Sequence, residues 1–304
     1  MRLGLNSLMG DELGIHAEES RQFNAARGLR RGPATLEELR AVRAQRSQHS
    51  PATDPGACTR TVSVGDRAVA VRILLPCNGP PRGIYLDIHG GGFYMDTAAF
   101  ADPRNRHLAD TLQVAVVSVD YRLAPENPWP AAPDDCATAA QWLIDHGAAE
   151  FGTSRMVIGG FSAGSTLAVT TLLRLRDRGL RSHFAGAALQ FGTYDLSAST
   201  PAGRRIADEY FLDAYVGDAE DRTRPDISPV FGELHDLPPT LLVVGADDVL
   251  LDDNLAMAAR LSAAGNDVDL RVYPAAPHAF TSQPTALAAV ARAHIEAWIA
   301  AHLK

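Results

Sequence analysis

The sequence has little of several features that would point to particular classes of protein. Only one of its 28 basic residues is a lysine, Lys304, and its 36 acidic residues give a formal net charge of −8. So acidic a chain lacks the basic surface that binds nucleic-acid phosphates, and we expect no nucleic-acid partner. It contains no uninterrupted apolar run of about 18 residues, so we expect no membrane-spanning helix.

Cysteine is scarce as well. Cys58, Cys77 and Cys136 are widely spaced and form no C-x-x-C pair, which argues against a disulfide framework and favours reduced thiols. The N-terminal residues lack the apolar segment of a secretory signal peptide. Together these two absences predict a cytoplasmic protein.

Apolar residues are plentiful, at 46% of the chain, and are enough to build a large core. Short apolar runs alternate with longer helical patterns, which predicts an α/β fold with a mostly parallel sheet and helices on both faces. The expected strands are Gly83–Ile88, Val114–Val119, Met156–Ile158, Ala185–Leu189, Leu241–Val244 and Val268–Tyr273. The expected helices are Arg104–Leu112, Asp134–His146, Ser165–Arg176, Asp253–Ala264 and Thr285–Ala301.

Three segments stand outside this alternation. Residues 61–75 alternate in hydrophobicity around Gly65-Asp66 and predict a hairpin. Residues 1–50 carry polar helical patterns. Residues 194–229 separate two strands by more than one helix, and an insertion of that size over the carboxyl edge of the sheet is where a lid would lie.

The first motif with chemical content is Gly160-Phe161-Ser162-Ala163-Gly164, between an expected strand and an expected helix. This is the pattern and context of a nucleophile elbow, in which a tight turn exposes the serine hydroxyl at a helix N-terminus. Gly160 and Gly164 leave room for the turn. A serine in an ordinary glycine-rich turn remains an alternative, whereas a dinucleotide-binding fingerprint does not match in register.

The second motif is His89-Gly90-Gly91-Gly92-Phe93, directly after another expected strand. In lipases and esterases such a run forms the oxyanion hole, because glycines let backbone N–H groups approach one point. The alternative is a glycine-rich turn with a structural histidine. We expect His89 to support the loop by hydrogen bonding rather than to transfer protons.

A serine nucleophile of this type needs an acid and a histidine that follow it in the chain. Of the later histidines, His278 comes after an expected strand in a loop, as a catalytic histidine should. The acid should follow the strand Leu241–Val244, where the candidates are Asp247, Asp248, Asp252 and Asp253. Position along the chain does not choose between Asp247 and Asp248.

At this point the sequence resembles the hormone-sensitive-lipase-like family of α/β-hydrolases, the bacterial family IV esterases with an HGGG motif. Besides the two glycine motifs, the resemblance rests on residues 120–126 (DYRLAPE), 248–252 (DVLLD) and 278–280 (HAF), and it covers about residues 60–300. It implies Asp248 as the acid, and Gly91, Gly92 and Ala163 as the oxyanion-hole donors. It also implies one α/β-hydrolase domain with its core at about residues 50–304 and a helical cap from about residues 1–46 and 196–226.

Three positions depart from the family's pattern. Phe161 occupies a position that is usually acidic, Val249 replaces a proline, and Ala279 replaces a glycine. None of these changes removes a catalytic group, so they bear on substrate preference rather than on the reaction class.

The motifs together predict a serine carboxylesterase that uses Ser162, His278 and Asp248, with a small-molecule ester as substrate and no metal or organic cofactor. The same residues would also suit an amidase or an acyltransferase. A non-catalytic receptor on this fold is a further alternative, although such receptors lack the histidine that is present here. We expect a monomer or a homodimer.

The substrate pocket is expected from aromatic residues near the motifs and in the insertion. These residues are Phe93, Tyr94, Phe161, Phe211 and Tyr215. A helix with one apolar face in the insertion would close over the site, which favours acyl chains of short to medium length.

Overall fold

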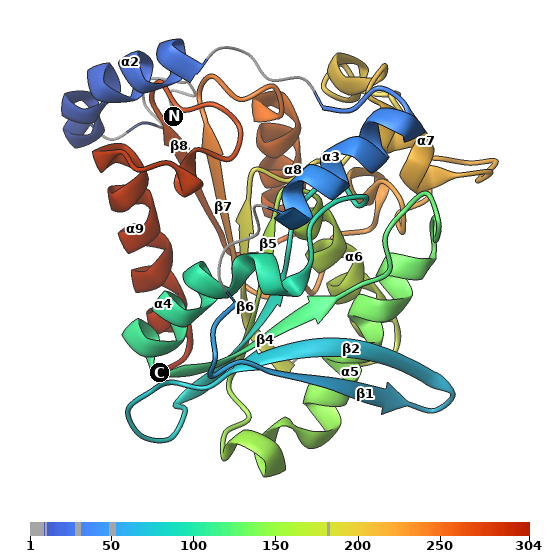
Figure 1. The fold of residues 1–304 in the computed structure, drawn as a ribbon, viewed down its shortest axis with the longest axis vertical. Helices are drawn as coiled ribbons and strands as arrows, with labels where there is room; N and C mark the ends of the chain where they lie inside the picture. The colour runs from blue at the N-terminus through green and yellow to red at the C-terminus, as the bar shows by residue number, and fades with distance from the viewer. Residues whose placement is uncertain (1–8, 10, 28–31, 49–52, 181–182) are drawn as a thin grey trace.

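One eight-stranded sheet organises the part of the chain that the structure, a computed structural model, describes: residues 9, 11–27, 32–48, 53–180 and 183–304. The strand order is β1-β2-β4-β3-β5-β6-β7-β8 (Figure 1). The strands are β1 (Cys58–Val64), β2 (Arg67–Leu74), β3 (Gly83–Ile88), β4 (Val114–Asp120), β5 (Met156–Phe161), β6 (Phe184–Gln190), β7 (Thr240–Gly245) and β8 (Val268–Tyr273).

Strand direction follows the expectation of a mostly parallel sheet. From β4 through β3, β5, β6 and β7 to β8, each strand is parallel to its neighbour. The hairpin expected around Gly65-Asp66 is confirmed, because β1 and β2 pair antiparallel with Val64 opposite Arg67. β2 then pairs antiparallel with β4 and joins the hairpin to the parallel part.

Helices cover both faces of the sheet, as expected. α5 (Ala131–Phe151), α6 (Ala163–Asp177) and α8 (Leu251–Ala263) contribute to the core on one face. α4 (Asp102–Leu112) and α9 (Ala286–His302) contribute to the core on the other. Because both faces are covered, β3 and β7 are buried along their whole length, which is why their sequences read as continuous apolar runs.

The expected boundary of β5 is wrong by three residues. The strand continues past Ile158 because Gly159, Gly160 and Phe161 pair with β6. Glycine has a low intrinsic preference for strands, and here pairing with a neighbouring strand overrides that preference. As a result the strand leads directly into Ser162.

The segments expected to form a cap lie in the upper half of Figure 1, away from the β1–β2 hairpin, but in two places. α3 (Leu36–Gln48) and α7 (Tyr210–Val216) lie on the right, and α2 (Ala17–Arg27) lies on the left, where it contacts α9. Arg43 of α3 donates to the backbone oxygens of Tyr94 and Ala124 at 2.7 and 2.5 Å. Of the expected element 1–46, positions 1–8, 10 and 28–31 lie outside the described residues.

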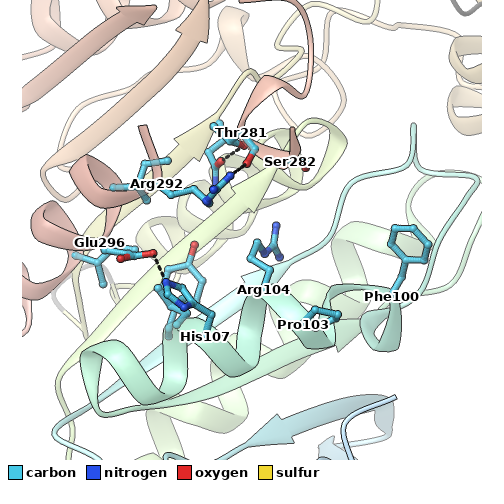
Figure 2. Close-up of a pocket in the computed structure, with 13 residues that line it drawn as sticks. Phe100, Pro103, Arg104, His107, Thr281, Ser282, Arg292 and Glu296 are labelled. Atoms are coloured by element: carbon cyan, nitrogen blue, oxygen red, sulfur yellow. Dashed lines mark hydrogen bonds and ion pairs between the residues drawn. The ribbon is translucent and has the colours of Figure 1, made fainter. Parts of the chain in front are cut away.

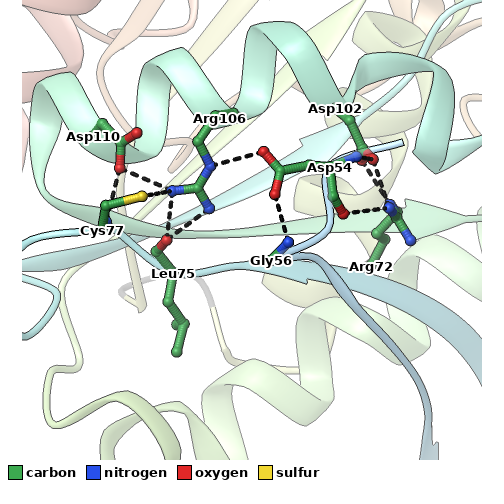
Figure 3. A network of polar contacts seen from close by, with 8 residues as sticks. All are labelled: Asp54, Gly56, Arg72, Leu75, Cys77, Asp102, Arg106 and Asp110. Carbon is green, nitrogen blue, oxygen red and sulfur yellow. Dashed lines mark hydrogen bonds and ion pairs between the residues drawn. The ribbon is translucent and has the colours of Figure 1, made fainter. Parts of the chain in front are cut away.

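A polar network fixes α4 to the hairpin side of the sheet (Figure 3). Arg72 of β2 donates to both carboxylate oxygens of Asp102, at 2.6 and 2.5 Å, and Asp102 is almost completely buried. One turn further along α4, Arg106 pairs with Asp54 at 3.1 Å and donates to the Leu75 backbone oxygen. Because Asp102 is buried, this two-point ion pair is a strong constraint on where α4 begins.

Among the residues that the structure describes, no helix combines the length and the hydrophobicity that a membrane crossing requires.

The contact between the start of α6 and β3 generates a testable prediction. A Cβ atom on Gly164 would lie 2.0 Å from the backbone oxygen of Ile88, so Gly164→Ala should separate the helix from the strand. We expect the free energy of unfolding to fall by about 3 kcal/mol, measured by urea denaturation. Gly14→Ala is the matched control, because a Cβ there meets nothing within 4 Å. Equal stability of the two variants would contradict the prediction.

Candidate active site

Ser162 lies in a strained turn between a strand and a helix. β5 ends at Phe161 and α6 begins at Ala163, and the serine between them has φ 54° and ψ −119°. A positive φ is costly for a residue with a Cβ atom and persists only where the surroundings impose it. Here the backbone of Gly160 packs closely against that of Gly164, because a Cβ on Gly160 would lie only 2.3 Å from the Gly164 backbone oxygen. The turn therefore needs glycine on both sides of the serine.

The serine, the histidine and one aspartate form a continuous chain of hydrogen bonds. Ser162 Oγ lies 2.9 Å from His278 Nε2, and His278 Nδ1 lies 3.0 Å from Asp248 Oδ2 and 3.2 Å from Oδ1. A carboxylate only accepts, so a neutral His278 donates from Nδ1 to Asp248 and leaves Nε2 to accept from the serine hydroxyl. This is the tautomer that a general base at Nε2 requires.

Burial distinguishes Asp248 from the neighbouring aspartates, a choice that position along the chain left open. Asp248 is buried and its Oδ1 also accepts from the backbone N–H of Leu250 at 2.9 Å. Asp247 and Asp252 are exposed and make no contact with His278. The structure thus brings Asp248, and not Asp247, to the histidine.

Two loops hold the acid and the histidine in register. Asp247 donates its backbone N–H to the Ala276 oxygen at 3.0 Å, which ties the loop after β7 to the loop after β8. A Cβ on Gly245 would lie 1.9 Å from the same oxygen, so only glycine permits this approach. Ala279, where the family pattern has glycine, takes up a left-handed conformation with φ 61° directly after His278.

The HGGG segment presents backbone donors beside the serine. Gly91 and Gly92 have φ values of 108° and 61°, which glycine adopts without strain. Ala163 is the first residue of α6, so its N–H has no partner within the helix. Within the described part of the chain, the N–H groups of Gly91, Gly92 and Ala163 make no hydrogen bond to the protein, and they remain available to a ligand.

His89 packs and hydrogen-bonds within the HGGG segment. Its ring stacks on Tyr121 at 4.2 Å between centroids, and its Nδ1 donates to the Gly90 oxygen at 2.7 Å. Burial lowers the pKa of His89, so the ring stays neutral. Tyr121 in turn donates to the His89 backbone oxygen at 3.0 Å.

A cavity of about 160 Å³ opens at Ser162 and His278. Of the expected pocket residues, Phe93 and Phe211 line it. Tyr94 and Tyr215 do not, and they lie behind those two rings: Tyr215 stacks on Phe93 at 3.9 Å, and Tyr94 meets Phe211 edge-on at 6.3 Å. Phe161 does not line it either, and lines a separate cavity of about 140 Å³ with Gly90 and Gly91.

Sequence reasoning missed several residues that line the cavity at Ser162. Arg205, Ile206 and Glu209 all come from the insertion. No local pattern marks these positions, because they reach the cavity through the path of the insertion and not through a motif.

Asp253, one of the candidate acids, has a different role in the structure. It is buried in the first turn of α8, and its Oδ2 accepts from the backbone N–H groups of Tyr194 and Asp195, where the insertion leaves the sheet. Burial raises the pKa of Asp253 to about 6. Its part is to hold the base of the insertion, and it does not contact His278.

Among the described residues, no group of three or more His, Cys, Asp or Glu side chains is placed to hold a metal ion.

Comparisons with known proteins define the class to which this fold and site belong. Residues 85–282 match a protein family described as "alpha/beta hydrolase fold". An arylesterase of Saccharolobus solfataricus is 32% identical over 227 residues, which are 70% of this chain and 73% of that protein. A hormone-sensitive lipase from a metagenome library has a TM-score of 0.74 and 29% identity, and the match covers 97% of this chain and 98% of that one. A bacterial heroin esterase has a TM-score of 0.81 and 26% identity, with 98% and 99% covered.

The chain is therefore an α/β-hydrolase. Within that superfamily it belongs to the hormone-sensitive-lipase-like family IV esterases, and it is a carboxylic ester hydrolase.

Proposed function

We propose that this enzyme is a serine carboxylesterase that cleaves short- to medium-chain esters with Ser162, His278 and Asp248. The observation that carries the proposal is the pair of hydrogen bonds at His278, 2.9 Å to Ser162 Oγ and 3.0 Å to Asp248 Oδ2. These distances lie within the range that general base catalysis needs. The cytoplasmic location expected from the sequence belongs to the same proposal.

In the proposed reaction, His278 Nε2 removes the proton of Ser162 as Oγ attacks the ester carbonyl carbon. The carbonyl oxygen becomes an oxyanion and accepts hydrogen bonds from the N–H groups of Gly91, Gly92 and Ala163. Collapse of the tetrahedral intermediate breaks the bond to the alcohol oxygen, which takes the proton from His278. Water then attacks the acyl-serine by the same route and releases the carboxylic acid.

The backbone donors make the largest single contribution in this scheme. They are fixed before the substrate arrives, so no reorganisation is needed when charge develops. One such donor is worth about 2.7–4 kcal/mol of barrier in other serine hydrolases. Asp248 acts differently: it holds His278 in the right tautomer and stabilises the imidazolium that forms.

The size of the cavity supports a short acyl group. Its volume is about 160 Å³, below the range of roughly 300–1,000 Å³ that is usual for small-molecule sites. Phe211 of α7 and Ile206 form part of its wall.

Because these two residues come from the insertion, we assign residues 196–226 to a cap over the site. Residues 1–46 form a second part of that cap, within a single hydrolase domain whose core is at about residues 50–304. The aryl esters that name one relative are suitable test substrates.

The nucleophile is tested by covalent labelling. An aryl phosphonate should attach to Ser162 and abolish hydrolysis of nitrophenyl acetate, because the strained turn exposes this hydroxyl to an activated ester. Mass spectrometry locates the adduct, and Ser162→Ala, with an unchanged circular dichroism spectrum, should lose labelling and activity together. Ser165→Ala is the control, because Ser165 is buried and its hydroxyl contacts the Gln190 backbone. An adduct on any other serine would disprove the assignment.

The acid is tested by two neighbouring substitutions. Asp248→Asn should lower kcat about 10⁴-fold, because an amide in place of the carboxylate disfavours the Nδ1–H tautomer of His278. Asp247→Asn changes the charge equally at an exposed position and should lower kcat less than about threefold. The measurement is nitrophenyl acetate hydrolysis at saturating substrate. Comparable losses in the two variants would contradict the proposed role of Asp248.

Chain-length preference tests the cavity. Across nitrophenyl esters of increasing length, kcat/KM should peak between about two and eight carbons, because each methylene gains burial energy only until the cavity is full. Phe211→Ala removes part of the wall and should move the maximum to longer chains. Tyr210→Ala on the same helix lies off the cavity and should leave the maximum in place. A maximum at twelve carbons or more in the unmodified enzyme would refute the cavity's role.

A further inference from the structure

A second and larger cavity lies between α4 and α9, on the face of the sheet that these two helices cover (Figure 2). Its volume is about 480 Å³, and small-molecule sites fall between about 300 and 1,000 Å³. None of the residues that line it lines the cavity at Ser162. It therefore has room for a whole ligand of its own.

The walls of this second cavity combine apolar and cationic groups. Leu108, Ile295 and Ile299 supply an apolar surface from the two helices. Arg104 comes from α4 and Arg292 from α9, and Figure 2 shows them entering the same space from opposite walls. Such a lining fits a ligand with one charged end and an apolar body.

Arg292 is a cation of the cavity wall that forms no ion pair with a described side chain. Arg104 pairs with Asp87 at 2.6 Å, and the carboxylate on the wall, Glu296, is engaged by His107 at 3.0 Å. Arg292 Nη1 donates to the Thr281 backbone oxygen at 2.6 Å. An arginine that forms no ion pair and lines a cavity can donate charged hydrogen bonds to an anionic group there.

Tyr85 adds a hydrogen-bond donor to the lining of the cavity. The residue is only 4% exposed, and its ring lies in the lining of the cavity. No hydrogen bond joins its hydroxyl to a described residue, and the hydroxyl is not among the fully buried polar atoms, so a group in the cavity can reach it. Burial raises the pKa of Tyr85, so the hydroxyl remains a donor. The carboxylate of an anionic ligand can accept a hydrogen bond from this hydroxyl.

We propose that the cavity between α4 and α9 binds a small organic carboxylate, with its charged group at Arg292 and Arg104 and its apolar body along Leu108, Ile295 and Ile299. The Tyr85 hydroxyl donates a further hydrogen bond to the ligand. The apolar walls favour an alkyl or aryl carboxylate over inorganic phosphate, which would leave them in contact with water. This site is independent of the reaction at Ser162.

The test is a calorimetric titration with sodium octanoate. It is made on enzyme whose Ser162 carries a phosphonate, so that the catalytic cavity is already occupied. Saturable binding with one site per chain is expected, and octylamine of equal length and opposite charge should not bind. Should labelling of Ser162 fail, only the proposed catalytic role is affected, and the same titration on unlabelled enzyme and on its Arg292→Gln variant then tells whether octanoate occupies this cavity.

Two substitutions test the contacts. Arg292→Gln should weaken octanoate binding about 10- to 100-fold, since it removes a charged hydrogen bond, and Arg292→Lys should recover part of that loss. Tyr85→Phe should weaken binding about fivefold without lowering the melting temperature, because the Tyr85 hydroxyl lines the cavity and makes no hydrogen bond to a described residue. Arg21→Gln, an equal change of charge on exposed α2, is the control and should have no effect.

Three results would overturn the proposal. One is the absence of octanoate binding to the labelled, folded enzyme. Another is binding that is unchanged in both Arg292→Gln and Tyr85→Phe. The third is binding of octylamine or inorganic phosphate as tight as that of octanoate, which would show that the cavity does not select an organic anion.

Discussion

The structure depends above all on the turn that carries Ser162 from β5 into α6. A serine with φ 54° is held there because Gly160 and Gly164 allow backbone to approach backbone more closely than any Cβ would permit. The same approach presses the start of α6 against β3, whose end leads into the HGGG segment. The turn at Ser162 is thus tied to the strand that leads into the HGGG segment.

The remaining groups reach the site because parallel strands end at one edge of the sheet. β3, β5, β7 and β8 run in the same direction and lead to His89, Ser162, Asp248 and His278. Ligands in open α/β sheets bind at this edge. The loops after β7 and β8 are joined by the Asp247 to Ala276 hydrogen bond, so the acid and the histidine are positioned as one unit.

The two sides of the HGGG segment differ in chemistry. On one side the insertion brings Phe211 and Glu209 to the cavity at Ser162. On the other, Phe161 packs edge-on against Phe191 at 4.6 Å and lies 5.5 Å from the Arg104 guanidinium. The cavity at Phe161 and the cavity between α4 and α9 share three lining residues, Phe100, Arg104 and Ser282. Phe161, at a position that is acidic in the family's pattern, therefore places an apolar ring near the cavity between α4 and α9.

The sequence by itself determined most of the secondary-structure elements and the residues of the proposed site. Local patterns sufficed for the parallel strands, the hairpin at Gly65-Asp66, the elbow at Ser162 and a histidine in the loop at 278, because each depends on neighbours within a few residues. Only the tertiary structure separated Asp248 from Asp247 by burial, moved Tyr215 behind Phe93, and brought Arg205 and Glu209 to the cavity. It also placed Arg104 of α4 and Arg292 of α9 in the lining of the same cavity. These outcomes depend on how segments far apart in the chain pack together, and packing between distant segments leaves no periodic trace in either one.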